Sequence, residues 1–336
     1  MPQIATSLIY QVAILFLMMV PGFILKKRKL VPDSFGRGLS GFVLYAAQPA
    51  LVFLAYLRPY DPSVLRGALW VLLFSFLAHA IFTVGAFLCF RRTEREKRKI
   101  LRMVTVFSNA AFMGIPLIGA LLDKTALLYA TVYNIIFNLV LWSLGVYICT
   151  HGRDENGSSD AVQTKKERRL ARRRAVASSF CALIHPVTVA AFLGLIFFFL
   201  PIEGFLPTLI TDALGMLAAT VAPLSMVVIG LRLASTDFRG ILRDGHMYLF
   251  LLLRHLILPA AVLLLLRLGH LVFPGISQPV MEVVLILASA PAASSATMFA
   301  ERYECDAAYA GKLVTVSTAF SILTMPLMLL LLGVGL

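Results

Sequence analysis

The chain has 336 residues, of which 60% are apolar, and its mean hydropathy is +0.88. A soluble domain carries about 45–50% apolar residues, so this composition excludes an ordinary soluble fold. The formal net charge of +13 would suit a nucleic-acid partner, but the basic residues gather beside the apolar runs, and this placement argues against nucleic acid.

Apolar runs of about 20 residues recur along the chain, and each is long enough to cross a hydrocarbon layer roughly 30 Å thick. The short alternating segments of a membrane β-barrel are not seen. The sequence therefore predicts an all-α polytopic membrane protein with ten transmembrane helices. In chain order the predicted spans are 6–25, 36–57, 67–90, 103–122, 126–149, 178–200, 209–231, 246–272, 280–300 and 307–334.

The distribution of basic residues predicts the orientation of these spans. If the N-terminus lies outside, the predicted cytoplasmic segments hold 25 of the 30 Lys and Arg residues. Basic residues are retained on the cytoplasmic side of membrane proteins. We therefore expect a multi-pass protein of the cell (inner) membrane with both termini on the extracytoplasmic side. The basic stretch 26–29 directly follows the first run, which indicates a retained span and not a cleaved signal peptide.

The longest polar stretch separates five predicted spans from five others. The predicted domains are a five-helix unit at 1–150, a basic cytoplasmic linker at 151–177 and a second five-helix unit at 178–336. An odd number of spans gives the two units opposite orientations, as in inverted repeats. The segments "PALVFLAYLR" from Pro49 and "PLSMVVIGLR" from Pro223 support this relation, because each ends in Leu-Arg and the offset is 174.

The fourth predicted span contains residues that disfavour a regular helix. In "SNAAFMGIPLIGALL", Pro116 removes an amide donor and Gly114 adds backbone freedom. The repeat offset carries Pro116 to a position beside Pro291 in the ninth span. Interrupted helices at matching positions of two halves are typical of a transporter binding site. The alternative is a proline kink that only shapes helix packing.

The segment "SNAAFMGIPL" resembles the Asn-x4-Gly-Ile-Pro-Leu signature of the auxin efflux carrier family, which includes bacterial malonate-type carriers. Similar segments are "YAAQPALVF", "VAPLSMVVIGLRLA", "RHLILP" and "APAASSATMFAERYECDAAYA". The resemblance implies a ten-helix secondary carrier with two inverted five-helix repeats and broken helices four and nine that cross. Ala296 occupies the place of a further helix-nine proline in plant members, which leaves the exact second break open.

These observations define the candidate site. The expected substrate-binding residues are Asn109, Gly114, Ile115, Pro116, Asn134, Asn138, Pro291, Ala292, Ser294 and Ser295. The expected support or gating residues are Gln48, Pro49, Pro223 and Arg254. For the asparagines and serines the alternative is interhelical hydrogen bonding. For Arg254 the alternatives are a side chain that extends to the membrane interface and one that points inward. His255 is expected to point elsewhere, by about 100°.

The residue types favour an anionic substrate. Broken helices present free amides and positive helix ends, and no Asp or Glu lies deep in a predicted span. We expect a small organic anion, a mono- or dicarboxylate, carried by alternating access at the crossing. Motifs of hydrolases, nucleotide-driven pumps and cofactor enzymes are lacking, so no enzyme activity, catalytic residue, metal site or cofactor is expected.

Two alternatives remain: a sodium-coupled organic-anion symporter of related crossover fold, and a non-transporting membrane receptor or sensor. The expected partners are the anion and the lipid bilayer, and a homodimer is compatible with this interpretation.

The predicted topology is tested by labelling single-cysteine variants at Ser159 and Leu336 in intact cells. An impermeant thiol reagent should label Leu336→Cys and should not label Ser159→Cys, because only the C-terminus is expected outside. Labelling of Ser159→Cys from outside would show that the topology is wrong.

Overall fold

The computed structural model describes residues 10, 13–150, 186–200, 206–235 and 243–333. The predicted linker at 151–177, the start of the first and sixth predicted spans, and both labelling positions lie outside the described residues. The described part is helical throughout, and its only β-type pairing is one isolated bridge. It thus has the all-α architecture predicted from the hydropathy.

The helices of the N-terminal half follow the predicted spans closely. Segments named η are π-helical, with hydrogen bonds to the fifth preceding residue. In order the elements are α2 (Met19–Lys27), α3 (Phe35–Phe42), η1 (Val43–Ala47), α4 (Gln48–Tyr56), α5 (Pro62–Cys89), α6 (Arg95–Val106), η2 (Ala110–Gly114), α7 (Ile115–Leu121), α8 (Lys124–Val140), η3 (Leu141–Gly145) and α9 (Val146–Thr150).

The C-terminal half has the same character. Its elements are α11 (Pro186–Phe199), α12 (Thr208–Ala219), α13 (Val221–Ser235), α14 (Gly245–Leu252), η5 (Leu253–Ile257), α15 (Leu258–Val272), α16 (Gln278–Ser289), α17 (Ser294–Arg302) and α18 (Ala307–Gly333).

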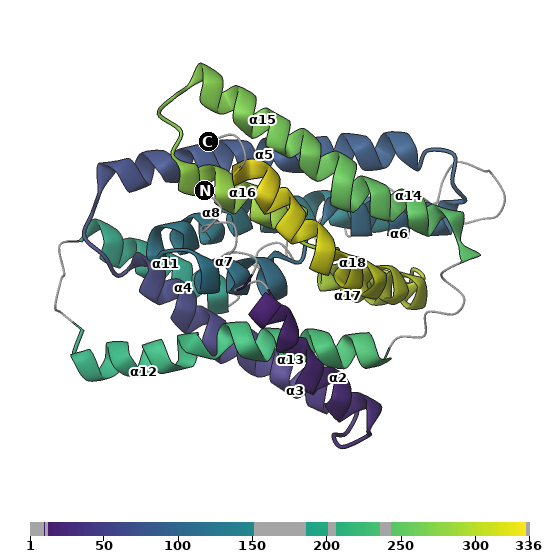
Figure 1. Ribbon diagram of the computed structural model, residues 1–336, viewed down its shortest axis with the longest axis horizontal. Coiled ribbons are helices and arrows are strands. Elements are labelled where there is room, and N and C mark those ends of the chain that lie inside the picture. The colour runs from purple at the N-terminus through teal and green to yellow at the C-terminus, as the bar shows by residue number, and fades with distance from the viewer. Residues whose placement is uncertain (1–9, 11–12, 151–185, 201–205, 236–242, 334–336) are drawn as a thin grey trace, which may run out of the picture.

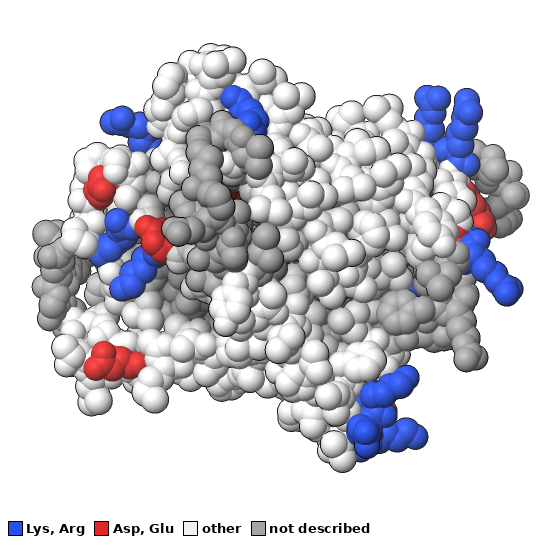
Figure 2. Space-filling view, viewed as in Figure 1, with Lys and Arg blue, Asp and Glu red and all other residues white. Residues whose placement is uncertain are grey.

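The helices and their surface are those of a multi-pass membrane protein. Six continuous helical stretches in the described part are long and apolar enough to cross a bilayer: Phe35–Tyr56, Pro62–Cys89, Lys124–Thr150, Thr208–Ser235, Gly245–Val272 and Ala307–Gly333. Figure 2 shows that, on the face in view, charged side chains gather at the two ends and leave an uncharged band between them. This band matches the apolar layer that the helices would cross.

Two predicted spans are interrupted. The span expected at 103–122 consists of α6 and the continuous stretch η2–α7, and the span expected at 280–300 consists of α16 and α17. The first interruption lies at 107–109 and not at Gly114-Ile115-Pro116, as the sequence predicted. Gly114 and Ile115 have right-handed helical backbone angles, so this part of the prediction was wrong.

A π-helical turn explains the displacement. Proline cannot donate, and it clashes with the carbonyl four residues earlier. The turn η2 ends two residues before Pro116, and the amides of Gly114 and Ile115 donate to the fifth preceding carbonyls. Turns η1 and η5 likewise end two residues before Pro49 and Pro259. The wider turn accommodates each proline without ending the helix.

The helices form two packing groups that each draw on both halves of the sequence. The first group contains α2, α3, α4, α11, α12 and α13, with close pairs α2–α13 and α4–α11. The second contains α5 to α9 and α14 to α18, with α16 packed against α5, α8 and α18. Figure 1 shows α2, α3, α12 and α13 of the first group along the lower edge, below α5, α14 and α15 of the second. The two groups meet mainly where α4 contacts α8, and where α13 contacts η2, α7 and α18.

Glycine allows the closest approach within the first group. A Cβ added to Gly22 of α2 would collide with the backbone of Val227, and one added to Gly230 of α13 would collide with the backbone of Met19. The α2 and α13 backbones therefore touch at reciprocal glycines, as small residues allow in membrane helix pairs. No side chain could move aside to make room, because the atoms in contact belong to the main chain.

We predict that Gly230→Ala lowers the unfolding temperature of the purified protein, because the new methyl group must separate α2 from α13. Overpacking of this kind costs about 1–3 kcal/mol. The matched control is Gly215→Ala in α12, where an added Cβ meets no atom within 4 Å. Thermal unfolding in detergent measures both variants. Equal unfolding temperatures for Gly230→Ala and the parent would contradict the proposed close contact.

Candidate substrate-binding site

The two interruptions pair with each other through their backbones. Ser108 and Ala292 form an antiparallel bridge. The amide of Asn109 donates to the Pro291 carbonyl at 2.7 Å, and the amide of Ala293 donates to the Phe107 carbonyl at 2.8 Å. Backbone groups inside a bilayer must find protein partners, since no water is available there. The pairing satisfies that requirement for two segments 184 residues apart in sequence.

Asn109 begins the helix that follows the first break. Its side-chain Oδ1 accepts the Phe112 amide at 3.4 Å, and the residue is buried, with 5% of its surface exposed. Asparagine is among the best residues for capping a helix N-terminus. Because Oδ1 is directed to the backbone, the Nδ2 donors are left to face the adjoining cavity. The second break ends similarly at the start of α17, where Ser294 and Ser295 are the first residues.

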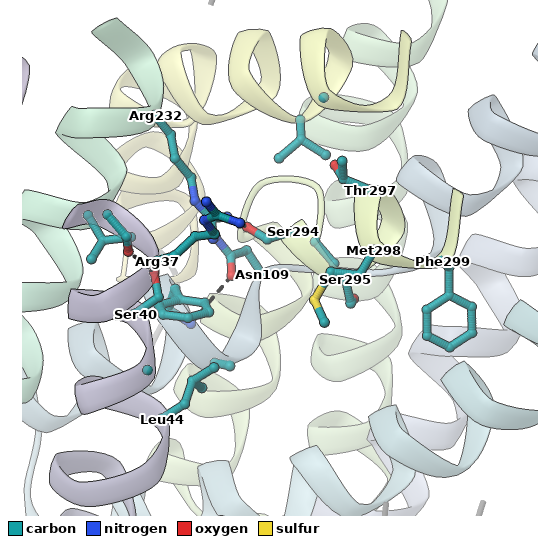
Figure 3. Close-up of a pocket in the computed structure, with 18 of the residues that line it drawn as sticks. Arg37, Ser40, Leu44, Asn109, Arg232, Ser294, Ser295, Thr297, Met298 and Phe299 are labelled. Atoms are coloured by element: carbon teal, nitrogen blue, oxygen red, sulfur yellow. Dashed lines mark hydrogen bonds between the residues drawn. The ribbon is translucent and has the colours of Figure 1, made fainter. Parts of the chain in front are cut away.

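A cavity of about 950 Å³ lies beside the paired breaks, between the two packing groups. Its volume is typical of a small-molecule site. Figure 3 shows Asn109, Ser294 and Ser295 around its inner part, with Arg37 and Arg232 directed toward them. Other residues on its wall include Ser40, Leu44, Gln48, Phe112, Asn134, Asn138, Trp142, Thr297, Met298, Phe299 and Thr315.

The structure gathers half of the expected substrate-binding residues on this cavity. Those on its wall are Asn109, Asn134, Asn138, Ser294 and Ser295. Those away from it are Gly114, Ile115, Pro116, Pro291 and Ala292. The first three of these lie in the η2–α7 stretch, and the last two provide backbone to the paired breaks. These five residues therefore shape the site without lining the cavity.

Some buried polar atoms on the cavity wall lack a hydrogen-bond partner among the described residues. They include Oγ of Ser295 and Oε1 of Gln48. Asn134 and Asn138 also line the cavity, and neither makes a side-chain hydrogen bond to another described residue. Leaving a buried polar group unpaired costs about 1–3 kcal/mol, so these atoms favour a polar occupant.

Gln48 repairs a defect that Pro116 creates. In the π-helical register of η2, the Ala111 carbonyl would accept from residue 116, where proline has no amide hydrogen. The Gln48 side chain donates to that carbonyl at 3.1 Å. Gln48 begins α4 in the first packing group, whereas η2 belongs to the second. Gln48 therefore supports the broken helix from the other packing group. The other expected support residues, Pro49 and Pro223, do not line the cavity.

Two arginines of this site were not among the residues predicted from the sequence. Arg232 of α13 lines the cavity, donates to the Ser294 hydroxyl and lies over the Phe112 ring at 5.4 Å. Arg37 of α3 lines the same cavity. Both belong to the basic residues at predicted cytoplasmic ends, which the sequence explains by topology alone. The segment that begins at Pro223 ends in Leu-Arg, and this repeat singled out Arg232 in the sequence. It did not indicate that the Arg232 side chain points into the cavity.

The outer part of the cavity carries both charges. Lys26, Asp33, Glu301 and Arg302 line it there. Lys26 donates to Asp33, and this ammonium group holds the pKa of the exposed carboxyl below its ordinary value. Asp33 is therefore ionised and paired near neutral pH. The carboxylates lie on the rim, whereas the groups around Asn109 are amides, hydroxyls and guanidinium groups.

Arg254 lies behind the breaks and is absent from the cavity wall. Only 1% of its surface is exposed, so of the two alternatives the burial favours the side chain that points inward. His255 was expected to point elsewhere. It is also fully buried, and hydrogen bonds connect both residues to the second break, because they occupy the turn η5.

Comparisons with known proteins agree with this architecture. The model of the membrane transport protein family matches residues 7–329. An uncharacterized transporter of Methanocaldococcus jannaschii is 21% identical over 328 residues, covering 94% of this chain and 96% of the relative. An uncharacterized transporter of Methanothermobacter thermautotrophicus is 26% identical over 334 residues, covering 96% of this chain and 97% of the relative.

We predict that Asn109→Ser weakens binding of a small carboxylate about tenfold or more. Serine retains the helix cap but removes the Nδ2 donors, and a lost hydrogen bond to a charged group costs about 1.5–3 kcal/mol. Asn109→Asp also retains the cap and should bind still more weakly, since it adds negative charge. Calorimetric titration of the purified variants with propionate and malonate measures this. Parent-like affinity of Asn109→Asp would exclude Asn109 as a ligand.

Proposed function

Because this chain belongs to the membrane transport protein family, the auxin efflux carrier family expected from its sequence, we propose that it is a secondary carrier of small organic anions. The observation that carries the proposal is the cavity beside the paired breaks, where donors predominate around Asn109. The proposed substrate is a mono- or dicarboxylate, bound between the two packing groups.

The donors of the cavity favour a carboxylate. The guanidinium group of Arg232 can bind a carboxylate through two parallel hydrogen bonds. Ser294, which now accepts from Arg232, would remain beside the bound group as a hydroxyl donor. The N-termini of η2 and α17 add the positive ends of two helices. A neutral isostere such as an amide would gain much less from these groups.

The contacts between the packing groups support alternating access. The cavity is lined at its outer part by Lys26 and Arg302, from the ends expected in the cytoplasm. Toward the opposite end, Tyr56 of α4 bonds to Thr131 of α8 at 2.5 Å, and Arg58, just past α4, donates to Thr125 of α8 at 2.6 Å. In the proposed cycle the second group moves against the first, so that these bonds break and the opposite side opens.

Uptake by proteoliposomes tests the proposal directly. The purified protein is reconstituted, and entry of labelled acetate, propionate, malonate and succinate is compared with entry of the corresponding amides. Carriage of at least one acid, with no carriage of its amide, is the expected result. Acid binding without uptake would favour the receptor or sensor alternative. Uptake that requires sodium and is lost in choline medium would favour the symporter alternative.

We predict that Arg232→Gln raises the acid concentration needed for half-maximal uptake by about tenfold or more, because a charged donor is lost from the substrate. The matched control is Arg28→Gln, since Arg28 lies just past the end of α2 and does not line the cavity. Initial uptake rates over a range of acid concentrations provide the measurement. Equal values for Arg232→Gln and the parent would exclude Arg232 from substrate binding.

A further inference from the structure

A single buried guanidinium group links the two breaks from behind. Nη1 of Arg254 donates to the Thr105 carbonyl at 3.1 Å, and Nη2 donates to the Ala290 carbonyl at 2.5 Å. Its Cζ lies 4.6 Å from the centre of the Phe82 ring. Among the residues that the structure describes, Arg254 forms no ion pair with a carboxylate. The backbone and the ring therefore provide its counter-charge.

The two carbonyls belong to helix C-termini. Thr105 is the penultimate residue of α6, and Ala290 directly follows α16. The C-terminus of a helix carries a partial charge of roughly −0.5. One guanidinium charge thus faces two helix ends whose partial charges sum to about −1. An isolated buried charge costs several kcal/mol, so this pairing explains how an arginine is tolerated inside the protein.

The same crossing contains two helix N-termini, at the start of η2 and at the start of α17. Each N-terminus carries about +0.5, so the four helix ends alone would nearly cancel. Arg254 changes that balance. We infer that Arg254 is a positioning residue that binds the C-termini of α6 and α16, holds the two breaks together and leaves the crossing electropositive for the substrate.

His255 completes the contact on the same side. Its Nε2 lies 2.8 Å from Ser317 Oγ, which accepts the Ala292 amide at 2.8 Å, and its Nδ1 lies 3.0 Å from Thr324 Oγ1. Because Ser317 Oγ accepts from Ala292, its hydroxyl hydrogen is free to donate to Nε2. The turn η5 therefore engages two carbonyls directly through Arg254, and its His255 reaches the Ala292 amide through the Ser317 hydroxyl. These are groups that the Asn109–Pro291 and Ala293–Phe107 bonds leave unused.

Arg254 acts through the backbone and not as a substrate ligand. Neither Arg254 nor its carbonyl partners Thr105 and Ala290 line the cavity, whereas Asn109 and Ser294 do. The backbone role stands on the contacts alone. The effect on anion binding rests on the proposed function. The two parts therefore need separate measurements.

Hydrogen–deuterium exchange of the purified full-length protein tests the backbone role. In Arg254→Met, peptides covering 103–110 and 288–295 should exchange about tenfold faster, while α8 peptides exchange as in the parent. Arg254→Lys should restore part of the protection, because an ammonium group can donate to both carbonyls. If Arg254→Met does not fold, Arg254→Lys decides alone, with faster exchange limited to the two peptides. Unchanged exchange, or an equal increase throughout the protein, would overturn the inference.

Arg267→Met is the matched control. Arg267 of α15 also donates to backbone carbonyls, those of Leu331 at 2.5 Å and Leu332 at 3.2 Å, near the end of α18. Its removal should leave exchange at 103–110 and 288–295 unchanged. Equal effects of Arg267→Met and Arg254→Met on these peptides would show a general response to charge loss.

Titration with propionate and propionamide, and with malonate and malonamide, tests the electrostatic role. Arg254→Met should weaken acid binding at least fivefold and leave amide binding unchanged, although Arg254 does not touch the cavity. Parent-like acid binding by Arg254→Met would overturn this part. Failure of the parent to bind any acid would instead count against the proposed function, and the exchange experiment would still decide the backbone role.

Discussion

The pairing of two extended backbone segments is the constraint on which the rest of the structure depends. A helix interrupted within a bilayer exposes amides and carbonyls that lipid cannot satisfy, at a cost of several kcal/mol for each group. Here the Asn109 and Ala293 amides bind the carbonyls of the opposite break. Neither interruption would be tolerated alone. The fold must therefore bring together segments from both halves of the sequence, and the mixed packing groups follow from that requirement.

The two faces of the paired segments have different tasks. One face borders the cavity and presents the side chains of Asn109 and Ser294. The other face is bound by η5, whose Arg254 and His255 engage the remaining backbone groups directly or through Ser317. The guanidinium charge of Arg254 can act on the site through its electric field although its side chain does not line the cavity. One face of the paired segments thus contributes to the binding site, and the other face is held in place by η5.

Hydropathy and residue type were enough to predict much of this architecture. The helix ranges follow from apolar length, and Asn109, Asn134 and Ser294 stood out because polar residues are rare in apolar runs. The exact break was not predictable from Pro116, because a π-helical turn displaces the effect of the proline by several residues. The repeat relation between 1–150 and 178–336 remains a prediction, as does the orientation in the membrane.

The arginines were harder to interpret for a related reason. Hydropathy reports how deep a residue lies along a helix, but not which way its side chain points. Arg232 lies near a helix end and turns into the cavity, and Arg254 lies within a long apolar stretch and turns inward. In both cases the direction depends on tertiary packing. Arg254 itself lies in a π-helical turn, whose wider backbone directs side chains differently from a regular helix.

The bond from Gln48 to the Ala111 carbonyl has a consequence for the kinetics of a moving carrier. The carbonyl is left without an intrahelical partner by Pro116, and its substitute donor belongs to the other packing group. If one group slides past the other, the bond from Gln48 to the Ala111 carbonyl breaks before another donor can replace it. The bare group would cost about 1–3 kcal/mol at the midpoint of the motion. Intermediate positions are thereby disfavoured, and the two groups would switch between discrete resting positions separated by a barrier.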